Sequence, residues 1–357
     1  MEGFRRAESM SEYTVGLLYP GRGPAGLFGP SCLSCTTLAA DDINTRGGLL
    51  GRELVVRPID SATGVANVTR EVETLLAAGE IDAIVGWHTS DVRRALSARL
   101  DLRVPYVYTA LYEGGESTAG VFLTGETPED QIRPALGWLR RERGLRRWWI
   151  VGSDYLWARD SAKACVRFAQ SLGDDLVGAR FVPVGTQDFS AVITDIARSD
   201  ADGVLMLLLG QDAVEFNRSF AAAGLDGAFV RYSPLMDEHM LMASGPEATR
   251  DLFASAGYFD SVVTTESMEF GARYFGRFGP DACTPTSMGE SCFEGMLLLE
   301  SLLSTVRSTD VRDIMAGAGR VQYEGARGNM ALRDGHAHQR MYLARAEGCD
   351  FDVIDQL

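Results

Sequence analysis

The feature of this 357-residue sequence that most constrains its fold is a regular alternation of short apolar runs and amphipathic stretches. Apolar runs at 13–20 and 81–85 precede stretches at 31–44 and 90–101, where apolar residues recur at helical spacing. Successive strand, helix and strand segments of this length are typical of βαβ units. They predict a parallel sheet with helices on both faces.

The alternation restarts in the middle of the chain. A helical stretch at 128–143 precedes the apolar run "RWWIVGSDY", and the pattern continues through "GVLMLLLG" at 203–210. The last third holds a long helical stretch near 286–304 and two hairpin-like endings. We therefore predict an α/β fold with two doubly wound parallel-sheet lobes, joined by a hinge in which the chain crosses three times. Lobe 1 is expected to hold residues 1–123 plus 254–327, and lobe 2 residues 124–253 plus 328–357.

Composition and charge exclude several classes of protein. Hydrophobic residues make up 46% of the chain, enough for a large core without a disulfide or metal staple. The net charge of −15 argues against direct binding of nucleic acid and against docking on anionic lipid. Insertion into a membrane would need a run of about 18 apolar residues, which the sequence lacks. The six cysteines show no zinc-site spacing, so no metal or cofactor is expected.

Polar side chains follow the strand predicted at 81–85. Trp87, His88, Thr89 and Ser90 stand between this strand and the next helical stretch. Ligands of parallel α/β sheets bind at the carboxyl ends of the strands. The second half has a similar junction at 203–212, where Gly210 and Gln211 follow a strand. Two such junctions facing each other predict a ligand-binding cleft.

An enzyme is the competing interpretation of the first junction. His88, Ser90 and Asp91 supply the side chains of a catalytic triad, but neighbours in one loop rarely point at one another. The sequence has no G-x-S-x-G element. The glycine-rich segment 21–29 lacks the order of a nucleotide-binding loop, and we expect a flexible loop at the cleft rim. A binding protein without enzymatic activity is therefore expected, with a hydrolase as the alternative of a different class.

Four segments resemble a known family. "AADDINTRGGLLGRELVVRPIDSATG", "IVGWHTSD", "VPYVYTALYEGG" and "WWIVGSDYLWARDS" are similar to the type I periplasmic binding proteins, the Leu/Ile/Val-binding-like family. Within it, they most resemble the branch that binds short amides and urea, which includes an amide sensor that regulates expression of aliphatic amidase. The resemblance covers about residues 13–354. It implies two lobes that close on one small polar ligand.

The resemblance also implies which residues line the cleft. In the first lobe these are Ser90, with Trp87 or His88 beside it, and then Tyr108, Ala110 and Tyr112 of the next turn; in the second lobe they are Tyr155, Gly210 and Gln211.

Two details bear on the ligand. Ala110 replaces a hydroxyl-bearing residue of the amide sensor, which puts a simple short amide in doubt. An α-amino acid would need a carboxylate site, which Ser90 and its helix start could supply, and an ammonium partner, for which Asp237 is the candidate.

The role of the protein has two interpretations. The first residues show no apolar core of a secretory signal, and the first cysteine is Cys32. We therefore expect a cytoplasmic ligand sensor that controls a catabolic operon through a regulator protein. The alternative is the solute-binding receptor of an ABC transporter for amides, urea or branched-chain amino acids. Its partner would be a permease, and it would be periplasmic after removal of a signal peptide. The sequence leaves open whether the protein forms a homodimer.

Overall fold

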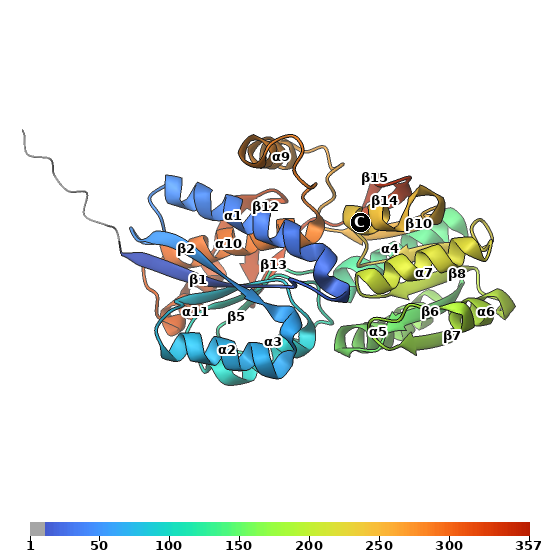
Figure 1. The fold of residues 1–357 in the computed structure, drawn as a ribbon, viewed down its shortest axis with the longest axis horizontal. Coiled ribbons are helices and arrows are strands. Elements are labelled where there is room, and N and C mark those ends of the chain that lie inside the picture. The colour runs from blue at the N-terminus through green and yellow to red at the C-terminus, as the bar shows by residue number, and fades with distance from the viewer. Residues whose placement is uncertain (1–10) are drawn as a thin grey trace, which may run out of the picture.

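The computed structural model describes residues 11–357, which form two α/β lobes lying side by side along the long axis of the molecule (Figure 1). The predicted fold class is confirmed: each lobe is built on its own sheet, and helices cover both faces. Residues 1–10, on which the expectation about a secretory signal mostly rests, lie outside the described residues.

The first lobe has an eight-stranded mixed sheet. Its strands, in spatial order, are β11 (Gln322–Gly325), β12 (Gly328–Arg333), β13 (His336–His338), β5 (Val121–Leu123), β4 (Tyr106–Tyr108), β3 (Ala83–Gly86), β1 (Glu12–Tyr19) and β2 (Glu53–Asp60). The strands from β13 to β2 are parallel, while β11, β12 and β13 are joined as antiparallel neighbours.

The second lobe has a seven-stranded sheet. Its order is β15 (Asp350–Gln356), β14 (Tyr342–Glu347), β10 (Leu252–Ala256), β9 (Val230–Ser233), β8 (Gly203–Leu207), β6 (Arg147–Ser153) and β7 (Asp175–Val182). The hairpin of β14 and β15 pairs antiparallel with β10, and the other strands are parallel.

The helices divide between the lobes. The first lobe carries α1 (Gly29–Thr45), α2 (Val65–Ala77), α3 (Ser90–Leu100), α9 (Thr265–Phe278), α10 (Ser287–Val306) and α11 (Val311–Gly317), with short 3-10 helices η1 (Pro24–Phe28), η2 (Ser61–Thr63) and η4 (Ala318–Arg320). The second lobe carries α4 (Pro128–Arg143), α5 (Leu156–Leu172), α6 (Ser190–Arg198), α7 (Gln211–Ala222), α8 (Glu238–Ser244) and η3 (Pro246–Ala248). In the first lobe, α1 packs on α10 and α2 packs on α3, on opposite faces of the sheet (Figure 1).

The chain crosses between the sheets three times, at 124–127, 257–264 and 339–341. The predicted boundary between residues 327 and 328 does not match the sheet topology, because β12 and β13, which follow it, are strands of the first sheet. The predicted boundary at 254 falls inside β10, a strand of the second sheet. The β12–β13 and β14–β15 hairpins look alike in sequence. The first belongs to lobe 1 because it pairs with β5, and the second belongs to lobe 2 because it pairs with β10. The rest of the predicted domain division stays a prediction.

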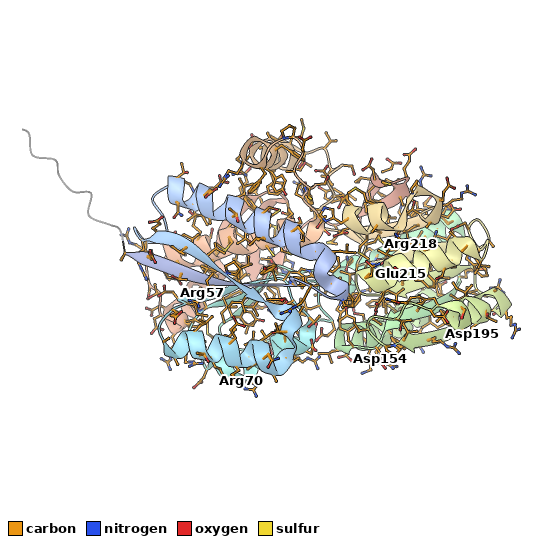
Figure 2. The ribbon with its side chains drawn as sticks, viewed as in Figure 1. Arg57, Arg70, Asp154, Asp195, Glu215 and Arg218 are labelled. Carbon is orange, nitrogen blue, oxygen red and sulfur yellow. The ribbon has the colours of Figure 1, made fainter. Side chains whose placement is uncertain are left out.

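Buried apolar side chains form two clusters, one on the α1 and α10 side of the first lobe and a larger one that continues from the first lobe into the second. Charged side chains such as Arg57 and Arg70 lie on the outer surface (Figure 2). Within residues 11–357, none of the helices is long and apolar enough to cross a membrane. The same part of the chain holds no group of three His, Cys, Asp or Glu side chains placed to bind a metal ion.

Candidate ligand-binding site

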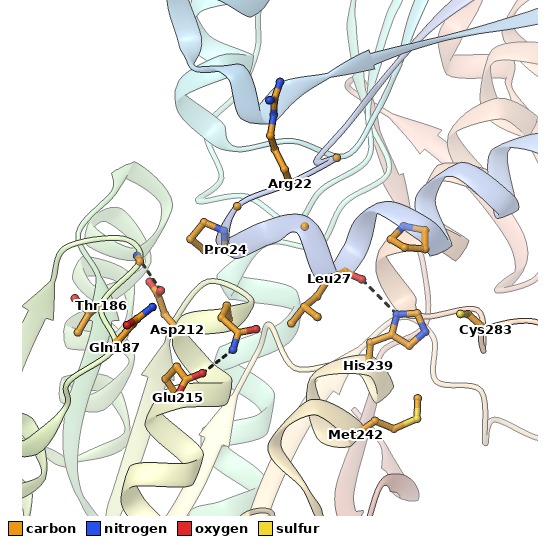
Figure 3. A pocket seen from close by; sticks show the side chains of 16 residues that line it. Arg22, Pro24, Leu27, Thr186, Gln187, Asp212, Glu215, His239, Met242 and Cys283 are labelled. Atoms are coloured by element: carbon orange, nitrogen blue, oxygen red, sulfur yellow. Dashed lines mark hydrogen bonds between the residues drawn. The ribbon is translucent and has the colours of Figure 1, made fainter.

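Two cavities lie where the lobes face each other. The smaller one, the inner chamber, has a volume of about 210 Å³ and lies between the ends of β1 and β3 and residue Leu209 of the second lobe. The larger one, the outer pocket, has a volume of about 820 Å³ and is lined mainly by residues 21–30 and by the second lobe (Figure 3). Parallel strands end at the same sheet edge, so both cavities sit where a ligand of this fold is expected.

The segment that follows β1 separates these two cavities. Its η1 helix crosses to the second lobe, where the Leu27 carbonyl lies 3.3 Å from Nδ1 of His239 (Figure 3). The Pro24 carbonyl lies against Gly210, and a Cβ atom at 210 would come within 2.0 Å of it. The expectation of a flexible loop at the rim is therefore wrong in one respect: the segment contains a short helix that contacts both lobes.

The junction of β3 and α3 forms the first-lobe wall of the inner chamber. Gly86 ends β3 with a φ of 147°, and a Cβ there would meet the Leu18 carbonyl at 2.0 Å, so only glycine fits this turn. Beyond it, Trp87, His88 and Thr89 line the chamber, and their expected contact with a ligand stays a prediction. Thr89 makes no side-chain cap, and the Val92 N–H donates to the Asp91 carboxylate at 3.0 Å, which leaves the N–H groups of Ser90 and Asp91 for a ligand oxygen.

Trp87 carries an unusual polar group. Its ring is buried and packs edge-on against Phe28 with 4.8 Å between ring centroids. Its indole N–H finds no hydrogen-bond partner among the described residues. A buried donor without an acceptor costs about 1–3 kcal/mol. A ligand carbonyl placed within hydrogen-bond distance of the indole nitrogen would remove that cost.

His88 is held as a neutral ring. Its Nδ1 lies 3.3 Å from the Thr89 carbonyl, and its Nε2 lies 2.9 Å from the Tyr106 hydroxyl. These contacts fit an imidazole that donates from Nδ1 and accepts at Nε2. Burial, with a smaller contribution from the nearby Arg93 guanidinium, lowers the pKa of His88 to about 3.

Ser90 lies at the start of α3, but its hydroxyl is already engaged. It donates to Glu113 at 2.6 Å, and the other oxygen of that carboxylate accepts from Arg93 and Arg94, both at 2.8 Å. Arg94 also reaches Asp160 of α5 in the second lobe at 3.2 Å. The predicted ligand contact is therefore part of a charged network, the Glu113 network (Ser90, Arg93, Arg94, Glu113 and Asp160), that extends across the cleft.

The residues predicted on the turn after β4 form a buried layer behind the chamber. Tyr108 donates to the His88 carbonyl at 2.7 Å, and Tyr112 bonds to Nδ1 of His336. Ala110 is buried beside them. None of these three is among the residues that line either cavity. Their expected contact with a ligand stays a prediction, and in this structure they pack behind the wall.

The second-lobe residues are divided between the cleft and the interior. Gln211 lines the outer pocket and donates to Glu215 at 2.7 Å, while Gly210 lies against the Pro24 carbonyl. Tyr155 is half-buried before α5. Asp237 caps α8 by accepting from the Met240 N–H at 2.9 Å, and burial raises the pKa of its carboxyl group. It lines neither cavity, so its predicted role as an ammonium partner gains no support here.

Sequence reasoning missed two parts of the site. Phe28 and Leu209 complete the packing around Trp87 and the chamber, but an apolar residue in a loop carries no distinctive signal. Arg93 and Arg94 were also missed. Two arginines in the first turns of a helix that begins beside a predicted ligand contact, with an acidic "YEGGE" turn to follow, were an available signal.

The neutral state of His88 predicts an acid-sensitive contribution to stability. An unfolded histidine gains a proton below its ordinary pKa of about 6.5, whereas the folded His88 does not until about pH 3. The unfolded chain binds more protons in this window, so stability falls as the pH drops from 6.5 towards 3. The substitution His88→Gln removes this contribution to the pH dependence of stability. The free energy of unfolding lost between pH 7.5 and 5.5 should be about 1.4 kcal/mol smaller in this variant than in the unaltered protein.

Urea unfolding at the two pH values measures this difference. His338→Gln, at an exposed position, is the matched control and should keep the full loss. Equal losses in all three proteins would contradict a buried neutral His88.

Gly210 predicts a steric limit on closure. Its φ of 49° and ψ of −112° are strained for other residues, and a methyl group would collide with the Pro24 carbonyl. Gly210→Ala should lower the free energy of unfolding by about 1–3 kcal/mol and force the η1 segment off the second lobe. Small-angle X-ray scattering should then show a larger radius of gyration.

Gly224→Ala separates strain from collision, because Gly224 has a φ of 68° and no neighbouring atom within 4 Å. It should lose stability with an unchanged radius of gyration. A radius that also stays constant in Gly210→Ala would argue against the steric limit.

The sequence matches the periplasmic binding protein family over residues 12–350. Among curated relatives, the Leu/Ile/Val-binding protein homologs 7 and 8 of Brucella melitensis biotype 1 are each 22% identical, over 91% and 87% of this chain and 85% and 84% of theirs. Neither of these relatives is named as an amide- or urea-binding protein, so the resemblance to that branch stays a prediction.

Two solved structures share the fold. A solute binding protein of an ABC transporter from Rhodopseudomonas palustris HaA2, in complex with p-hydroxybenzoic acid, has a TM-score of 0.87 at 18% identity and covers 97% of both chains. The branched-chain amino acid transporter substrate binding protein LivJ of Streptococcus pneumoniae, in complex with isoleucine, has a TM-score of 0.85 at 17% identity, with 96% of this chain and 99% of that one covered. With a family match that spans nearly the whole chain, and with two α/β lobes that both contribute to the lining of an inner chamber, this protein belongs to the periplasmic binding protein family.

Proposed function

We propose that this protein is a solute receptor of the ABC-transporter type, which binds one small molecule in the inner chamber and passes it to a membrane permease. The observation that carries the proposal is the chamber itself. Residues of both lobes line it, and its first-lobe wall contains Trp87, whose buried indole N–H has no partner among the described residues, and the start of α3, where Thr89 makes no side-chain cap. The family match and the solute-binding relatives support this role.

The relatives favour the receptor over the cytoplasmic sensor that the sequence led us to expect. One of the two solved structures is named as the solute binding protein of an ABC transporter and the other as a transporter substrate binding protein, and the family is named for the periplasm. The geometry likewise gives a hydrolase no support. Ser90 donates to Glu113, and His88 is bonded to Tyr106 and Thr89, so the serine and the imidazole are engaged with other groups.

The chamber favours a solute that carries a carbonyl oxygen and no net negative charge. The carbonyl would accept from Trp87 and from the first turn of α3. Arg22 is the cation among the lining residues, and it is paired with Asp60 at 2.7 Å. The exposed carboxylate of Asp91 also lines the chamber and would accept from an amide N–H. A neutral amide or urea fits this lining better than a free carboxylate.

A panel of four compounds tests this proposal. Acetamide, urea, isoleucine and 4-hydroxybenzoate are each added to the purified protein, and thermal unfolding is followed. A bound compound raises the melting temperature in a concentration-dependent way, since it stabilises only the folded state. We expect a shift with an amide or urea. A shift with isoleucine or 4-hydroxybenzoate alone would overturn the proposal of a neutral solute but would still support a solute receptor. Chemical turnover of a bound compound would overturn the proposal that the protein is a receptor.

Trp87→Phe tests the indole N–H directly. A net hydrogen bond of about 0.5–1.5 kcal/mol corresponds to about a 2- to 12-fold loss of affinity for the compound that binds, measured by isothermal titration calorimetry. Trp138→Phe is the matched control, because the indole of Trp138 donates to Asp355 on the second lobe, away from both cavities. Unchanged affinity in Trp87→Phe would remove the indole from the site.

Arg94 offers a second test, because it bridges the lobes without lining the chamber. Arg94→Gln breaks its contact with Asp160 and should weaken binding by up to about fivefold, the range of an exposed ion pair of about 0–1 kcal/mol. Arg99→Gln on the same helix breaks a pair with Glu73 inside the first lobe and should leave affinity unchanged. Calorimetry at low and high salt measures both variants, and equal affinities at low salt would contradict a bridging role.

A further inference from the structure

A buried guanidinium connects all three segments that join the lobes. The side chain of Arg327 is 1% exposed, and its Nη1 donates to Glu126 of the first crossing at 2.9 Å. The same nitrogen donates to Gln339 of the third crossing. Glu126 in turn accepts from the Gly257 N–H of the second crossing at 3.0 Å. The crossings are far apart in sequence, and Arg327 is the side chain at which they meet.

The packing around this junction leaves little room for rearrangement. A Cβ atom at Gly257 would lie 2.6 Å from Nη1 of Arg327, so the backbone of the second crossing passes directly against the guanidinium. Gln339 also donates to the Thr124 carbonyl at 3.0 Å, which ties the third crossing to the first. A change in the angle between the lobes that bends the chain at these crossing residues must alter at least one of these contacts.

The guanidinium is anchored on the first-lobe side by α10. Nε of Arg327 donates to Glu290 at 2.5 Å, and its backbone N–H donates to Glu294 at 3.2 Å. Both carboxylates are buried, and each keeps one oxygen without a partner among the described residues. Breaking one partner of such a buried cluster leaves uncompensated charge in a medium of low polarity. We therefore expect the contacts of Arg327 to Glu290 and Glu294 to persist when the lobes move, and its contacts to Glu126 and Gln339 to change.

We propose that Arg327 is a positioning residue that fixes the relative orientation of the two lobes by holding the three crossings at one point. The proposal goes beyond the proposed receptor role, because it concerns which lobe angles the chain can adopt with or without a solute. Arg327 then acts on binding only through the population of closed molecules.

Arg231 serves as a comparison, because it is a buried arginine whose contacts all lie within one lobe. Its side chain is also fully buried, and it bonds to Asn217, Asp226 and the carbonyls of Ala248 and Arg250. All of these partners belong to the second lobe, and none lies on a crossing. A substitution at Arg231 should weaken one lobe without changing the angle between the two.

The experiment measures the distance between the lobes with no ligand added. Spin labels are attached at Arg70→Cys on α2 and Thr194→Cys on α6, both exposed, after the exposed Cys283 and half-exposed Cys349 are changed to serine. Double electron–electron resonance then gives the distance distribution. Arg327→Met should broaden the distribution about twofold or more, or shift its maximum, because several lobe angles become populated. Arg327→Lys, which keeps the charge, should restore part of the original distribution.

Two further variants keep the proposal testable if Arg327→Met fails to fold. Glu126→Gln retains an acceptor for the Gly257 N–H but weakens the bond to Arg327, and it should also broaden the distribution. Arg231→Lys should lower the melting temperature and leave the distribution unchanged. A distribution equal to that of the parent protein in every folded Arg327 and Glu126 variant overturns the proposal. Because no solute is used, this outcome is independent of whether the four-compound panel binds.

Discussion

The structure depends on one geometric constraint: strands that run parallel all finish at the same edge of their sheet. In each lobe this edge faces the other lobe, so the loops that follow β1, β3 and β8 are brought to the same cleft. Loops with polar groups near such an edge can meet a ligand without disturbing the apolar cores behind them. The inner chamber, the η1 segment and the start of α3 all owe their positions to this arrangement.

Buried charge is the second organising element, and two of its clusters lie where the lobes meet. The Glu113 network lies behind the first-lobe wall and reaches α5, while Arg327 and its carboxylates lie at the three crossings. Ion pairs of this kind add little to net stability compared with apolar packing, but they are strongly directional and costly to leave half-satisfied. Their placement suits a molecule whose lobes must adopt defined relative positions.

The sequence was sufficient to predict the fold class, the two lobes and the position of the β3–α3 junction at the cleft, because these depend on local periodicity and on the strand-end rule; the ligand-binding role of the junction stays a prediction. Trp87, His88 and Thr89 do line the inner chamber. Other features depend on partners far along the chain. Whether Ser90 faces a ligand or Glu113 is decided by a turn 23 residues away. The hairpin at 328–338 belongs to the first lobe because of a single neighbouring strand, β5, and periodicity contains no information on that choice.

The contact between Gly210 and Pro24 has a consequence for how related binding proteins diverge. The partition between the inner chamber and the outer pocket rests on a backbone carbonyl that lies against a residue without a side chain. No substitution of Pro24 removes that carbonyl, so the size of the chamber on this side is coupled to residue 210. A relative with a larger residue there must seat its η1 segment further out and enclose a wider space. The residue at position 210 of the second lobe thus indicates where the η1 segment of the first lobe lies. In relatives that keep glycine at this position, a different solute must be accommodated by changes in the other residues that line the chamber.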